Sequence, residues 1–100
     1  MMGDRQLAGL ALEGFLRDGP CQLNELRARL EAADMPGTRS RAHALKGAAA
    51  TASAESLQAL ALAIEGAGAA GQWDRCGELL PRAVEEFERF KSTLVESGWI

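Results

Sequence analysis

His43 is the only histidine in this 100-residue chain, and it lies in a stretch, residues 39–50, whose composition favours a helix. An α-helix turns by about 100° per residue, so residues three and four positions apart share a face. One face then carries the imidazole with two cations and two small residues: Arg39, His43, Lys46, Gly47 and Ala50. Another face is apolar and suited to burial: Ala42, Leu45, Ala49 and Ala52. We therefore expect the histidine to be presented to a partner.

Other kinds of site are poorly supported by the sequence. No metal site is predicted, because the single histidine has no carboxylates or cysteines at ligand spacing. Cys21 and Cys76 match no zinc or redox motif, so we expect two free thiols rather than a disulfide. Residues 66–71 formally match GxGxxG, but dinucleotide binding needs a strand before the glycines, and none is available. This stretch is better interpreted as a flexible helix end and a loop.

Charge and hydropathy narrow the class of protein. The net charge of −3 argues against general nucleic-acid binding, which requires a basic surface. No apolar run approaches the roughly 20 residues that cross a bilayer, and the first residues lack the apolar core of a secretory signal. We expect a single cytoplasmic domain spanning residues 1–100, with no membrane or nucleic-acid partner.

The periodicity of the apolar residues predicts helices throughout. Residues typical of strands are scarce, with two valines, two isoleucines, three threonines and no tyrosine. Five helical segments are predicted: 4–17, 20–33, 38–51, one that follows Ser53 and runs through Ile64, and 74–97. The predicted fold is all-α, an antiparallel up-down four-helix bundle with an additional N-terminal helix. Gly19-Pro20 could either break or kink the chain between the first two segments.

Local signals place the ends and buried faces of these segments. The expected N-caps are Asp4, Thr38 and Ser53, with Glu55 in the first turn after Ser53. Pro81 is expected to bend the last helix or mark its effective start. The buried stripes are expected to be Leu23, Leu26, Leu30 and Ala33, then Leu57, Leu60, Ala61 and Ile64, and finally Cys76, Leu80, Ala83, Phe87, Phe90 and Leu94.

The pattern HxLKG at residues 43–47 resembles the signature of histidine-containing phosphotransfer domains, the small helical-bundle carriers of His-Asp phosphorelays. The resemblance extends to residues 15–20 upstream and to Leu57 and Ile64-Glu65 downstream, so it covers essentially the full chain. The chain departs from the family about ten residues after the histidine. Members usually have a glycine in that turn, whereas this chain has Ala50-Thr-Ala-Ser-Ala54.

The resemblance implies that His43 accepts a phosphoryl group from a receiver-domain aspartate and passes it to another. Lys46 would offset the phosphoryl charge, and Gly47 would leave room for the partner's active site. Glu65 or Gln58 would accept a hydrogen bond from the second ring nitrogen and fix the tautomer. Arg39 would complement the receiver's acidic pocket. The site residues implied are thus His43, Lys46, Gly47, Arg39 and Ala50, with Glu65 and Gln58 as orienting candidates.

The resemblance also implies a monomeric phosphoryl carrier without kinase activity or a cofactor of its own. The Mg²⁺ of the reaction would lie on the partner receiver domain, and the partners would be receiver domains and a hybrid sensor histidine kinase. Two alternatives remain open: a docking module that binds a receiver without transferring phosphate, and a generic helical adaptor in which HxLKG is coincidental.

Overall fold

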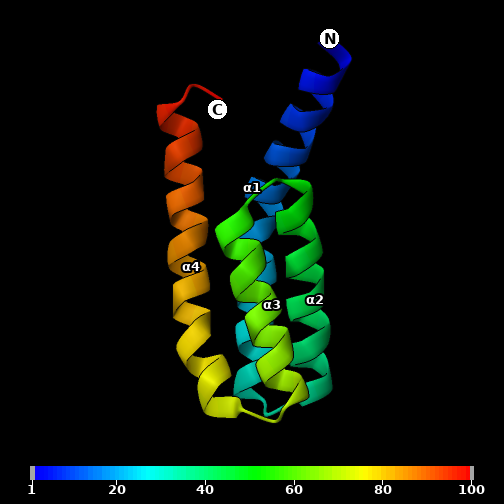
Figure 1. Ribbon diagram of the computed structural model, residues 1–100, viewed down its shortest axis with the longest axis vertical. Helices are drawn as coiled ribbons and strands as arrows, with labels where there is room; N and C mark the ends of the chain where they lie inside the picture. The colour runs from blue at the N-terminus through cyan, green and yellow to red at the C-terminus, as the bar shows by residue number, and fades with distance from the viewer. Residues whose placement is uncertain (1, 100) are drawn as a thin grey trace.

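The computed structural model describes residues 2–99, which fold into four helices joined by short turns (Figure 1). The helices are α1 (Met2–Glu31), α2 (Met35–Thr51), α3 (Glu55–Ala69) and α4 (Trp73–Glu96). They run alternately up and down, with α1 packed against α2 and α4, and α3 packed against the same two helices. The described residues contain no strand, so the all-helical prediction is confirmed. None of these helices is long and apolar enough to cross a membrane.

The N-terminal part of the chain differs from the prediction of an additional helix. The first two expected segments form the single helix α1, which continues through Pro20, and Asp4 lies inside this helix instead of capping one. Phe15 before the proline and Leu23 after it are buried in the same core, so packing holds both halves in line although proline lacks one helical hydrogen bond. The first turns of α1 extend beyond the α2–α3 turn (Figure 1).

Aromatic rings and a glycine bring α1 and α4 together. The ring of Phe15 makes edge-to-face contacts with Phe87 and Phe90, at centroid distances of 5.5 and 5.7 Å. Gly19 is buried one turn further along α1, and a Cβ atom at this position would collide with the ring of Phe87. The glycine before Pro20 is therefore explained by close approach of α4.

The N-caps of α2 and α3 differ from the predictions. Asp34 caps α2, since its Oδ1 accepts a hydrogen bond of 2.9 Å from the Gly37 amide. Thr38 lies inside the helix, fully buried, and its hydroxyl donates to the Asp34 carbonyl. Ala54 is the N-cap of α3 and offers no capping side chain, because Ser53 occupies the turn with a left-handed φ of 61°. A serine thus occupies a left-handed turn, a conformation that usually favours glycine.

The buried stripes follow the prediction closely. Of the predicted positions Leu30, Leu60 and Phe90 are half-buried, and Ala33 is exposed because α1 ends at Glu31. Pro81 lies inside α4, so it does not mark the start of that helix. The glycine-rich stretch differs most: α3 continues through Ala69, and these glycines are helical up to that residue. Both cysteines are free thiols, as expected, and Cys76 is buried.

Removing the Asp34 side chain tests the observed cap of α2. We expect Asp34→Ala to lower the free energy of unfolding by about 1 kcal/mol, the typical loss of an N-cap. Ser53→Ala, at the position expected from sequence to cap α3, should change it by no more than about 0.5 kcal/mol, since no capping bond is lost. Urea denaturation of both variants measures this, and equal losses would contradict the assignment of the caps.

Candidate functional site

Helix α2 presents the His43 face to solvent and buries the opposite face, as its periodicity indicates. Ala42, Leu45 and Ala49 are completely buried, and Ala52 is nearly so. On the other side His43, Arg39, Gly47 and Ala50 are exposed, and Lys46 is half-buried. The imidazole is accessible, with 66% of the His43 side-chain surface open to solvent.

Glu65, from the facing helix α3, contacts the side chains of both His43 and Lys46 on α2. Its Oε2 lies 2.8 Å from Nδ1 of His43, and its Oε1 accepts a hydrogen bond of 2.9 Å from Nζ of Lys46. The side chains of Glu65 and Lys46 are only 25% and 26% exposed. One partly buried carboxylate thus holds the imidazole and the ammonium group side by side, one on each oxygen.

The charge state of Glu65 determines which nitrogen of His43 carries a proton. The hydrogen bond from Lys46 lowers the pKa of the Glu65 carboxyl below its ordinary value; burial opposes this shift, and the bond to His43 adds to it. An ionised carboxylate can only accept hydrogen bonds, so Nδ1 must be the donor. In the neutral imidazole Nε2 is then left with a free lone pair.

Of the two orienting candidates, the structure brings Glu65 to His43 and leaves Gln58 elsewhere. Gln58 lies two turns earlier on the same face of α3. Because α2 and α3 are antiparallel, that displacement places Gln58 beside the Ala50 end of α2 rather than beside His43. Within the described residues, no hydrogen bond joins Gln58 to the imidazole.

Gly47 has no internal packing role. A Cβ atom at this position would meet no atom within 4 Å, so neither a neighbouring helix nor the His43 ring requires the absence of a side chain. Glycine costs about 1 kcal/mol relative to alanine inside a helix. The open surface beside His43 is therefore consistent with space for an external molecule.

The contact between Lys46 and Glu65 was not anticipated from the sequence. The sequence indicated that Lys46 is one turn from His43 and that an acid on the next helix could reach the imidazole. The sequence contained no signal that one acid would contact both the imidazole and the Lys46 ammonium group, because such a contact depends on the distance between α2 and α3.

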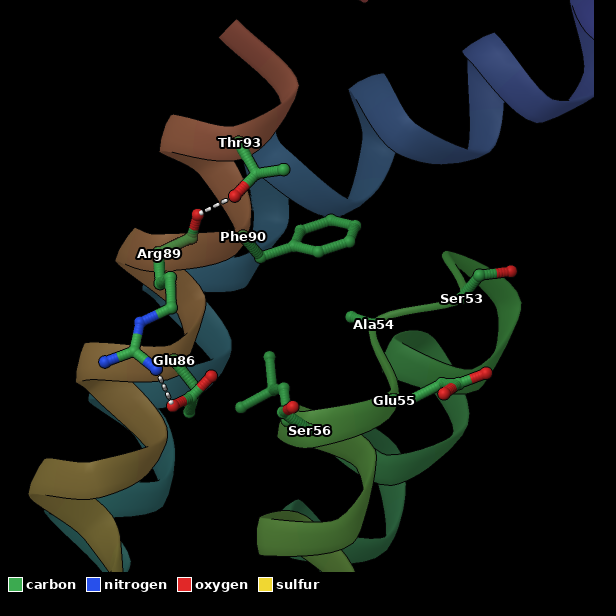
Figure 2. A pocket seen from close by; sticks show the side chains of 9 residues that line it. Ser53, Ala54, Glu55, Ser56, Glu86, Arg89, Phe90 and Thr93 are labelled. Carbon is green, nitrogen blue, oxygen red and sulfur yellow. Dashed lines mark hydrogen bonds and ion pairs between the residues drawn. The ribbon is translucent and has the colours of Figure 1, made fainter. Parts of the chain in front are cut away.

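A separate pocket of about 240 Å³ lies between the α2–α3 turn and α4, and Figure 2 shows its lining. Arg89 is already paired there with Glu86 at 3.0 Å, and Thr93 donates to the Arg89 carbonyl. The lining does not include His43, Lys46 or Glu65. We therefore place the functional site on the His43 face and not in this pocket.

Within the part of the chain that the structure describes, no three histidine, cysteine, aspartate or glutamate side chains lie close enough together to hold an ion. The groups that meet at His43 instead comprise a nucleophile, a cation and a carboxylate. Such a set suits transfer of an anionic group to a ring nitrogen.

Comparison with known proteins gives one family. A family model described as the Hpt domain matches residues 11–93, which is more than four fifths of the chain and includes His43, Lys46 and Glu65. No curated protein and no solved structure gives a significant match.

The lowered pKa of Glu65 predicts a pH-dependent contribution to stability. The Glu65 carboxyl binds protons more tightly in the unfolded chain than in the folded one. Its contribution to the free energy of unfolding is therefore fully present at pH values above its ordinary pKa of 4.5. That contribution is lost as pH falls through the lower folded pKa. We expect wild type to be more stable than Glu65→Gln at pH 7, and the difference to shrink on acidification below pH 4.5. Thermal unfolding from pH 7 to pH 3 measures it, and a constant difference would be contrary to this assignment.

Proposed function

This chain belongs to the Hpt domain family, and on that premise we propose that it carries phosphoryl groups between receiver-domain aspartates, with Nε2 of His43 as the acceptor atom. Hpt domains are phosphocarriers of two-component phosphorelays and interact with receiver domains and histidine kinases. The observation that carries the proposal is the contact between Nδ1 of His43 and Glu65 at 2.8 Å. This contact leaves the other nitrogen free on an exposed ring.

The transfer step follows from this arrangement. The lone pair of Nε2 attacks the phosphorus of the phosphoaspartate, a bond forms between nitrogen and phosphorus, and the bond from phosphorus to the aspartate oxygen breaks. The aspartate leaves as a carboxylate. The ring becomes positively charged while Nδ1 keeps its proton, and the ionised Glu65 stabilises that charge. The reverse step delivers the phosphoryl group to a second receiver.

Lys46 supports the phosphorylated form. In the unphosphorylated protein its ammonium group is held by Oε1 of Glu65, one turn from the ring. The phosphoryl oxygens bring additional negative charge next to it, and a lysine with three donors can bond both an oxygen of this group and Glu65. We propose that Lys46 acts before transfer by keeping Glu65 ionised and after transfer by offsetting the phosphoryl charge.

The remaining parts of the reaction belong to the partner. We propose that the Mg²⁺ needed for transfer is held by the acidic pocket of the receiver domain, and that this chain acts as a monomeric carrier in the cytoplasm without kinase activity. Arg39 and Ala50, on the exposed His43 face, belong to the surface that meets the receiver.

Incubation with a phosphorylated receiver tests the proposed function. With Mg²⁺ and a receiver domain encoded beside this chain, we expect an acid-labile label on wild type and none on His43→Gln. The same samples are assayed for binding. Binding without label would instead support a docking module, and the absence of both would support a generic helical adaptor; either result contradicts the carrier.

Filling the space at Gly47 tests the partner-facing surface. We expect Gly47→Leu to weaken receiver binding by about tenfold, or about 1.4 kcal/mol, because its side chain occupies space that the receiver needs. Gly77→Leu is the matched control, since Gly77 is also an exposed helical glycine with nothing within 4 Å of a built Cβ. Isothermal titration calorimetry compares the affinities of the two variants for the receiver. Equal affinities would show that Gly47 does not lie in the interface.

A further inference from the structure

A buried glycine of α3 lies directly beneath the side chain of Arg39. A Cβ atom built on Gly68 would lie 2.9 Å from Cγ of Arg39 and 3.1 Å from Sδ of Met35. Real Cβ atoms are seldom this close to their neighbours, so even alanine would force these side chains to move. Gly68 lies inside α3 and has no left-handed φ, so the backbone does not require glycine here. The close approach of the Arg39 stem is the remaining structural reason for glycine.

The guanidinium group of Arg39 forms no ion pair with a described acidic residue. Five other arginines lie within 4.0 Å of a carboxylate: Arg17, Arg29, Arg41, Arg75 and Arg89. Among the described residues no acid is within this distance of Arg39, although its aliphatic stem is packed on α3. Arg39 thus has a stem that packs on α3, and it is exposed with no described carboxylate within 4.0 Å.

Arg39 precedes His43 by four residues, so the two side chains are neighbours on one face of α2. Lys46 is the next cation on this face, but its ammonium group already forms an ion pair with Glu65. Arg39 therefore supplies the unpaired positive charge nearest to the imidazole on this helix face. A guanidinium group suits recognition of carboxylates because its donors form a planar fork.

We infer that Gly68 is a positioning residue that acts through Arg39. Because residue 68 has no side chain, the stem of Arg39 can lie across α3. The guanidinium group of Arg39 can then meet the carboxylates of the receiver's acidic pocket beside His43. The inference rests on the proposed function. Packing of the stem before binding reduces the side-chain freedom that is lost when the complex forms. Gly68 belongs to the stretch that formally matches GxGxxG, and its proposed role is to make room for Arg39 rather than to bind a nucleotide.

A double-mutant cycle tests whether Gly68 acts through Arg39. The variants are Gly68→Ala, Arg39→Met and the combination, and Arg39→Met keeps an aliphatic stem while removing the charge. Binding to the receiver domain that phosphorylates His43 is measured by isothermal titration calorimetry at low and moderate salt. We expect Arg39→Met to weaken binding about tenfold, as for loss of one charge-assisted hydrogen bond, and to reduce the salt dependence. Gly68→Ala should weaken binding about threefold or more alone and by less than about twofold in the Arg39→Met background.

Two controls separate this effect from structural damage. Gly66→Ala adds the same methyl group to α3 where nothing lies within 4 Å, so binding should be unchanged. Arg82→Ala removes an exposed arginine from α4 and controls for net charge. Thermal unfolding establishes that each variant is folded. If Gly68→Ala does not fold, Arg39→Met remains informative, because wild-type affinity in that variant would overturn the inference.

The outcomes also separate the inference from the proposed function. Wild-type binding by Gly68→Ala, or an equal loss with and without Arg39, would overturn the role of Gly68 while His43 still becomes labelled. Failure of His43 to accept label in wild type would contradict the proposed function, and this inference with it.

Discussion

The carboxylate of Glu65 joins α3 to His43 and Lys46 of α2, one on each oxygen. The side chains of Lys46 and Glu65 are partly buried but remain in contact with solvent. Ion pairs near the surface contribute about 0–1 kcal/mol to stability, so we assign the importance of this contact to orientation rather than to folding energy. It fixes the proton of His43 on Nδ1 and directs Nε2 outward. It also holds the ammonium group of Lys46 one turn away. Since the carboxylate is partly buried and the imidazole is mostly exposed, the orienting group is fixed while the reacting group stays accessible.

The core between α2 and α3 makes this contact possible. Small residues at the buried positions, Ala42 and Ala49 on α2 and Ala61 on α3, allow the two helix backbones to approach closely. Ile64, next to Glu65 in sequence, is buried, so its packing fixes the rotation of α3 and turns the carboxylate toward α2. The alanine-rich interface between α2 and α3 therefore determines which residue of α3 lies opposite His43.

The helices and their buried faces could be predicted from the sequence, whereas the helix caps and the contacts between helices could not. The exposed position of His43 and the placement of Lys46 one turn later follow from helical periodicity alone. The choice between Glu65 and Gln58 depends on the register of α2 against α3, for which one sequence contains no direct signal. Similarly, Pro20 suggested a break or kink, and packing on both sides of it keeps α1 continuous. Glu65 and Pro20 are thus residues whose structure is determined by a neighbouring helix. The N-caps are local features, yet the structure has them at Asp34 and Ala54 rather than at Thr38 and Ser53.

The central claim is that Glu65 selects Nε2 of His43 as the phosphoryl acceptor. The most direct measurement is a long-range proton–nitrogen NMR spectrum of the ¹⁵N-labelled protein after transfer from a phosphorylated receiver, recorded with and without phosphorus decoupling. The predicted result is phosphorus coupling to Nε2, with the proton retained on Nδ1. Coupling to Nδ1, which would require the contact with Glu65 to break, would contradict the account.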